Sequence, residues 1–108
     1  MGSKMKISEM ISTRKLIAKG ANEVIQSNDD SMEPLIVKDT IQFIHWQPAP
    51  DFNGQTMAVR IKNGSIMYKK VYYEKGYIRL VSLNEKYADE KYAFNDIEIL
   101  GKVIIEID

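Results

Sequence analysis

Residues 55–83, QTMAVRIKNGSIMYKKVYYEKGYIRLVSL, contain three short runs rich in β-branched and aromatic residues. The runs alternate between apolar and polar side chains, as strands with one buried face do. Asn63-Gly64 separates the first two runs and is a strong hairpin signal, because both residues tolerate a positive φ. The tripeptide EKG at 74–76 separates the second run from the third. Three strands joined by tight turns predict an antiparallel sheet.

Further strand signals flank this segment on both sides. They lie in EVIQS (23–27), TIQFIHW (40–46) and IEILGKVIIEI (97–107). The last run is long, and Gly101 predicts a bend in it. Residues 84–96, NEKYADEKYAFND, are expected to form a polar loop, and only residues 7–18 have a helical spacing of apolar side chains. The fold class is therefore expected to be mostly β, a compact antiparallel β domain at 23–108 preceded by a tag, arm or linker at 1–22.

Composition excludes several classes of function. The 108 residues suffice for one domain with a modest core, and 15 basic residues balance 15 acidic ones, which argues against a nucleic-acid-binding surface. Without cysteine there are no disulfides or thiolate metal sites. His45 is the only histidine, so a Ser-His-Asp triad is not expected. No apolar run approaches the roughly 20 residues of a membrane span, so we expect a cytoplasmic location and no membrane partner.

The segment NDDSMEPLIVKDT (28–40) places Ser31 in an unusual setting between two predicted strands. Two aspartates precede the serine, and Pro34 excludes a helix interior just after it. A serine hydroxyl is a weak nucleophile unless a base takes its proton. Without cysteine or a suitable histidine, that base would be a neutral lysine. Lysines reach the neutral form near pH 7 only where burial lowers their pKa.

Lys69 is the lysine that fits this requirement. Strand alternation places it on the same face as Met67 and Val71, whereas Lys70 points to the opposite face. Taken singly, Ser31 would be an ordinary turn serine and Lys69 a lysine whose ammonium reaches solvent. The acidic residues around Ser31 are typical of turns, and we expect neither a metal ion nor a cofactor.

The combination of DDSMEPLIVKDTI, NGQTMAVRIKNGSIMYKKV, LVSLNEKY and ILGKVI resembles the carboxy-terminal domain of the LexA and phage-repressor family of self-cleaving regulators. The resemblance covers residue 23 to the end of the chain. It implies a compact antiparallel β fold of the LexA and signal-peptidase type. It also implies that Ser31 is the nucleophile, that Lys69 is the general base, that Lys70 is structural or solvated, and that Met32 packs beside the site.

This chain departs from the family pattern at two positions. Asp29 stands where the family usually has glycine before Asp-Ser-Met, and Lys38 replaces the glycine that precedes Asp39. If position 29 requires a positive φ, aspartate tolerates it better than most residues. The turn is therefore expected to survive both changes.

The resemblance implies latent self-cleavage by a Ser-Lys dyad in a phage-type or SOS-type transcriptional repressor. In the family the cut bond joins a small residue to glycine far upstream of the serine, a distance that falls before Met1 here. We therefore expect the cut site and the DNA-binding helix-turn-helix domain to be absent from this chain. A UmuD-like polymerase accessory subunit and a signal-peptidase-like serine protease are the alternatives.

The implied partners follow from the same resemblance. They are a second copy of the chain in a homodimer or higher homo-oligomer, a RecA filament or an antirepressor, and DNA only through the absent domain. The apolar run at 97–107 also favours self-association, because an unpaired edge on such a strand would promote aggregation.

Overall fold

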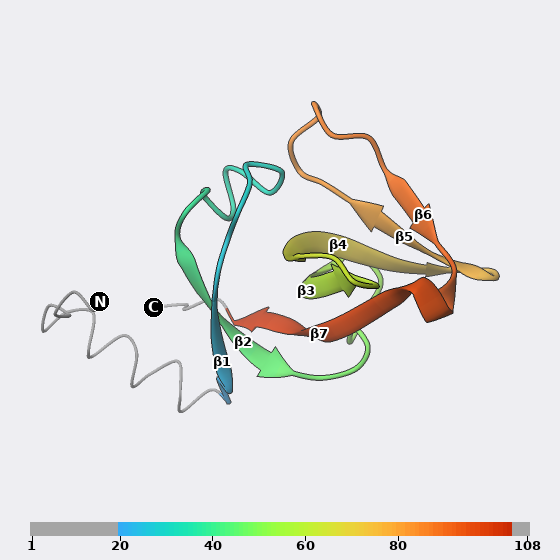
Figure 1. The fold of residues 1–108 in the computed structure, drawn as a ribbon, viewed down its shortest axis with the longest axis horizontal. Helices are drawn as coiled ribbons and strands as arrows, with labels where there is room; N and C mark the ends of the chain where they lie inside the picture. Colours follow the sequence, from blue (N-terminus) through green and yellow to red (C-terminus); the bar gives the residue numbers. More distant parts are fainter. Residues whose placement is uncertain (1–19, 105–108) are drawn as a thin grey trace, which may run out of the picture.

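The computed structural model describes residues 20–104, which form one antiparallel sheet of seven strands in the order β1-β2-β7-β3-β4-β5-β6 (Figure 1). A single 3₁₀ turn, η1, lies between β6 and β7. The elements are β1 (Glu23–Gln26), β2 (Ile41–Trp46), β3 (Gln55–Ile61), β4 (Ile66–Glu74), β5 (Tyr77–Val81), β6 (Glu90–Tyr92), η1 (Phe94–Asp96) and β7 (Ile97–Ile104). The expected mostly-β fold class is confirmed.

The three strands expected within residues 55–83 all form, and both turns join neighbouring antiparallel strands. At the first turn Gly64 N donates to Ile61 O at 2.7 Å, and of the Asn63-Gly64 pair only Asn63 has a positive φ, of 63°. The prediction of a polar loop at residues 84–96 is partly wrong, because this segment contains β6 and η1. β6 forms by pairing with β5, where Tyr92 lies opposite Ile78. The helix expected at 7–18 lies outside the described residues.

β7 lies in the interior of the sheet, between β2 and β3. Ala58 pairs with Gly101 and Val59 with Ile99, so Leu100 is an extra residue in β7 at this point. This β-bulge lies beside the glycine at which a bend was expected. The expectation of an unpaired edge on this strand is wrong, because β2 and β3 occupy its two edges.

Side-chain alternation along β4 divides the core into two clusters. Tyr68 belongs to a cluster with Met32, Ile36, Ile44 and Ala58. Val71 lies on the opposite face of β4 and belongs to a second cluster. The other buried members of that cluster are Met57, Val59, Ile78 and Leu80. Lys69 lies opposite Met57 in the β3–β4 ladder and therefore shares the face of the second cluster.

The curvature of the sheet brings distant segments of the chain toward one another. In Figure 1 the turn between β1 and β2 and the loop between β5 and β6 both extend from the upper side of the sheet, above β4. Backbone and side-chain hydrogen bonds from Asn84 in the loop to residues 30 and 31 in the turn join the two segments. Within residues 20–104 no helix is long and apolar enough to cross a membrane.

Candidate active site

The turn that carries Ser31 is held at its base and at its tip. At the base, Ser27 N donates to Thr40 O at 2.8 Å, and Asp39 N donates to Ser27 O at 3.0 Å. At the tip, Met32 and Ile36 are buried in the first cluster, and Ile36 N donates to Met32 O at 2.9 Å. Two buried apolar anchors therefore fix the backbone on either side of Pro34. This places Met32 directly beside the candidate nucleophile, in the core.

Ser31 is completely buried, with 0% of its surface exposed. Its hydroxyl donates to Asp29 Oδ1 at 2.6 Å, and its backbone N–H donates to the same oxygen at 2.9 Å. One carboxylate oxygen thus accepts both hydrogen bonds that Ser31 can donate. Asp29 is not among the described non-glycine residues with a positive φ, which are Asp39 and Asn63. Asp29, which stands where the family that this sequence resembles usually has glycine, therefore does not need a positive φ here.

Lys69 is also buried, with 3% exposure, in the middle of β4. Its Nζ donates to Ser82 Oγ at 2.7 Å and lies 5.0 Å from the centre of the Tyr87 ring. A cation over an aromatic face is attracted by the ring's electrons. The amine therefore has one hydroxyl partner, one aromatic partner and an apolar strand face around it, and it has little contact with solvent.

The loop after β5 closes over the turn through three hydrogen bonds. Asn84 N donates to Ser31 O at 2.9 Å, and Asn84 Nδ2 donates to Asp30 O at 3.2 Å. Tyr87 Oη donates to Asp30 Oδ1 at 2.5 Å. Because the Tyr87 ring also covers the Lys69 amine, this loop connects the serine turn to the lysine strand.

The charges in the site act on one another. Partial burial opposes ionisation of Asp29, but hydrogen bonds from the Ser31 side chain and backbone and the charge of Lys69 outweigh it, so the pKa of Asp29 is lowered. Asp29 and Lys69 therefore attract each other. The hydrogen bond to Asp30 is the main cause of a raised pKa of Tyr87, which keeps the phenol neutral at physiological pH.

The structure thus places Ser31 and Lys69, both buried, against the same loop, which contacts Ser31 through Asn84 and Lys69 through Tyr87. Each makes a different polar contact, Ser31 to Asp29 and Lys69 to Ser82, rather than a hydrogen bond to the other. Their catalytic roles remain predictions. Lys70, on the opposite face of β4, is half-buried.

Sequence reasoning missed three contributors to the site: Ser82, Asn84 and Tyr87. Of these, Ser82 had a usable signal. Glu74 and Tyr77 pair across the second turn, and counting outward from that pair places Ser82 opposite Lys69. Asn84 and Tyr87 lie in LVSLNEKY, a segment that carries the resemblance, but the sequence did not place them at the site, because their positions depend on how the β5–β6 loop folds back over the sheet.

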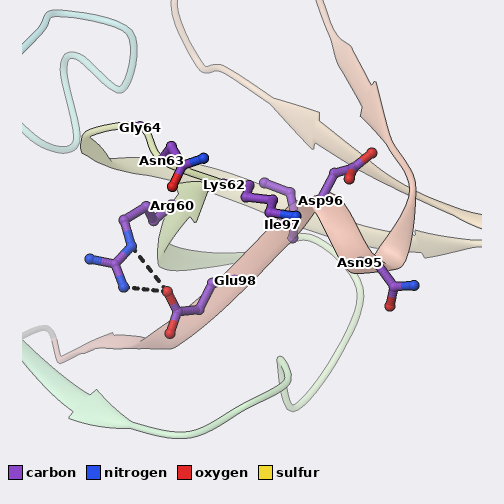
Figure 2. Close-up of a pocket in the computed structure, with 8 residues that line it drawn as sticks. All are labelled: Arg60, Lys62, Asn63, Gly64, Asn95, Asp96, Ile97 and Glu98. Atoms are coloured by element: carbon purple, nitrogen blue, oxygen red, sulfur yellow. Dashed lines mark hydrogen bonds and ion pairs between the residues drawn. The ribbon is translucent and has the colours of Figure 1, made fainter.

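A separate pocket of about 540 Å³ lies at the β3–β4 turn and includes neither Ser31 nor Lys69. Its walls come from residues 60–64 and 95–98, and Figure 2 shows Arg60 and Glu98 pointing toward each other across its side. Their ion pair satisfies both charges. Arg60 lies three residues along β3 from the Met57–Lys69 pair, roughly 10 Å away at the rise of a strand. The pocket is therefore distinct from the Ser31–Lys69 cluster.

Comparison with known proteins gives one result that covers nearly all of the chain. A family model described as Peptidase S24-like matches residues 4–104. No curated protein matches the chain.

Proposed function

The chain belongs to the Peptidase S24-like family, the serine peptidase family of LexA, UmuD and phage CI-like proteins, and we propose that it is the self-cleavage and dimerisation domain of a repressor of this kind. One observation supports this proposal above the others: the loop after β5 contacts both a buried serine and a buried lysine, with Asn84 N donating to Ser31 O and the Tyr87 ring 5.0 Å from Lys69 Nζ. A structural role alone rarely accounts for burying a lysine, because taking its charge out of water is costly.

The proposed chemistry is an acyl transfer by a Ser-Lys dyad. Ser31 Oγ attacks the carbonyl carbon of the bound peptide while the neutral amine of Lys69 takes its proton. The ammonium then gives that proton to the leaving amine as the peptide bond breaks. Water, deprotonated by the same lysine, then attacks the ester carbonyl; the bond from that carbon to Ser31 Oγ breaks, and the ammonium returns the proton to Ser31 Oγ. The backbone N–H of Ser31 is a suitable donor to the oxyanion of the tetrahedral intermediate.

The sequence that precedes this domain in the natural protein would decide between a repressor and a UmuD-like accessory subunit. A helix-turn-helix domain there supports the repressor. An arm that ends in a cut site without a DNA-binding domain supports the UmuD-like accessory subunit instead. In either form the tethered segment supplies the substrate at a high effective concentration.

Self-cleavage is tested on the protein extended at its N-terminus by a flexible segment that contains an Ala-Gly bond. We expect intact-mass spectrometry to show cleavage at that bond, faster at about pH 9.5 than at about pH 7, because the general base must be unprotonated. Ser31→Ala should stop cleavage, whereas Ser65→Ala, in the distant β3–β4 turn, should not change it. An extended protein that stays intact over this pH range, or a Ser31→Ala variant cut at the parent rate, contradicts the proposal.

The outer face of β1 and β2 supports the dimerisation part of the proposal. β1 is an edge strand, and Val24 and Ile41 share the face of the β1–β2 ladder that points away from the core. Both are about half exposed, at 47% and 56%. Two exposed apolar side chains on an open edge are suited to contact with a second copy.

Sedimentation velocity at about 50 µM, where a dimer with a micromolar Kd is well populated, is expected to show a dimer. Val24→Lys combined with Ile41→Lys should shift the species to a monomer, because two charges would be buried at the contact. Phe52→Lys is the matched control, since Phe52 is also an exposed apolar residue, at 63%, but lies in the β2–β3 loop. A monomeric parent, or a double variant that remains dimeric, argues against this interface.

A further inference from the structure

Asp29 Oδ1 accepts hydrogen bonds from the two groups of Ser31 that an acyl transfer would use. In an acyl transfer the developing oxyanion lies within hydrogen-bond distance of the nucleophile's own N–H and beside its hydroxyl oxygen. Asp29 Oδ1 has this position, 2.9 Å from Ser31 N and 2.6 Å from Ser31 Oγ. The same oxygen therefore binds both the hydroxyl that must attack and the backbone N–H that must stabilise the oxyanion formed by that attack.

The contact also gives the hydroxyl proton of Ser31 to Asp29 rather than to the proposed base. Ser31 Oγ has a single proton, and it donates that proton to Asp29. Lys69 meanwhile donates to Ser82, so neither hydrogen bond joins Ser31 to Lys69.

We propose that Asp29 is a built-in brake on the dyad: its carboxylate accepts the hydrogen bonds of the Ser31 hydroxyl and backbone N–H and so blocks both until substrate displaces it. This inference rests on the proposed function of the Ser31–Lys69 pair. An Asx turn, in which an aspartate accepts from the backbone two residues on, has the same backbone hydrogen bond. The brake differs in that it also blocks a buried hydroxyl beside a buried lysine.

Phosphonylation of Ser31 measures the reactivity of the dyad without a peptide substrate. A small fluorophosphonate forms a bond from Ser31 Oγ to phosphorus, the P–F bond breaks, fluoride leaves, and the hydroxyl proton passes to Lys69. The rate is followed by intact-mass spectrometry from about pH 6 to pH 9.5. The titratable groups that face Lys69 are Asp29 in the turn and Tyr87 in the loop, with Asp30 bonded to Tyr87. The raised pKa of Tyr87 keeps that residue neutral through most of the range.

Two substitutions of Asp29 test the brake by changing its hydrogen-bond acceptor to different extents. Asp29→Gly removes both the hydrogen-bond acceptor and the charge, and we expect it to raise the rate at neutral pH by about tenfold, the effect of losing one favourable charge-assisted hydrogen bond. Asp29→Asn retains an acceptor oxygen but removes the charge. Asp29→Asn should therefore be accelerated less than Asp29→Gly, an order that a purely structural role would not produce. Asp39→Asn, an equally negative but exposed position in the same turn, should match the parent.

The outcomes distinguish the brake from the proposed function. Labelling of Ser31 that requires Lys69, together with Asp29 variants no faster than the parent, overturns the brake alone. Slower labelling of Asp29→Gly in a protein whose far-UV circular dichroism is unchanged also overturns the brake, since it would assign Asp29 an assisting role. Absence of labelling in the parent and in every folded variant overturns both.

Discussion

Lys69→Met is expected to abolish the reactivity of Ser31 while leaving the domain folded. Methionine has nearly the length of lysine but carries no charge and cannot accept a proton. Loss of a positioned general base costs about 10²- to 10⁴-fold in rate, so cleavage and phosphonylation should both fall below detection at every pH tested. A rate that rises with pH in the parent and is absent at all pH values in the variant identifies the neutral amine as the required form.

The effect of this substitution on stability should be small. Lys69 lies opposite Met57 in the β3–β4 ladder, on a face that is otherwise apolar. Replacing a buried charge by an apolar side chain of similar volume is often neutral or stabilising. The losses are the hydrogen bond to Ser82 and the attraction to Asp29, which is partly exposed and can be solvated. We expect the free energy of unfolding to change by no more than about 1 kcal/mol.

Lys70→Met is the matched control, because Lys70 is adjacent in sequence but points to the other face of β4. It should react like the parent. If Lys69→Met were labelled and cut at the parent rate, Lys69 would be a structural lysine and the Ser-Lys mechanism would fail. If both lysine variants lost activity with an intact fold, the effect would lie in the strand rather than in the amine.

Local patterns predicted the parts of this molecule that depend on neighbouring residues. The alternation around Lys69 gave its face correctly, because side-chain direction along a strand has a period of two. The turns at 62–64 and 74–76 followed from the residues that such turns require. β6 was missed because its three residues, Glu90–Tyr92, lack an apolar alternation and become a strand only by pairing with β5.

Non-local contacts account for what the sequence could not reveal. The position of β7 between β2 and β3 depends on pairings across the whole chain, so its covered edges could not be foreseen. The contact between Asp29 and Ser31 depends on a side-chain rotamer within a buried turn. The contribution of Tyr87 depends on the loop that carries it across to Lys69. The sequence therefore predicted the two candidate catalytic residues but not the groups that surround them.

Among substitutions that add one methyl group to this sheet, Gly101→Ala is expected to lower the free energy of unfolding the most. A Cβ at this position would lie 2.2 Å from the backbone oxygen of His45 and 2.7 Å from Ile44 Cγ2. These distances are far inside van der Waals contact, and the first neighbour is backbone, which cannot rotate away. The chain must therefore separate β7 from β2, at the pair formed by Gly101 and Trp46.

The energetic cost should be about 3 kcal/mol or more, the upper range for inserting a methyl group into a well-packed core. A domain of this size typically has only about 5–15 kcal/mol of stability, so the denaturant midpoint should fall sharply. The damage should extend to the site, because β2 begins directly after the turn that carries Ser31. Urea unfolding followed by tryptophan fluorescence is a suitable measurement, since Trp46 lies at the affected pair.

Gly76→Ala separates this steric effect from the general cost of replacing a glycine. Gly76 has a φ of +88°, and a Cβ there would meet no atom within 4 Å. Its cost is therefore conformational strain alone, about 1–2 kcal/mol. Gly101 is not among the described glycines with a positive φ, so its cost is steric alone. If the order were reversed, with Gly76→Ala the less stable variant, the close approach of β2 to β7 at Gly101 would be disproved.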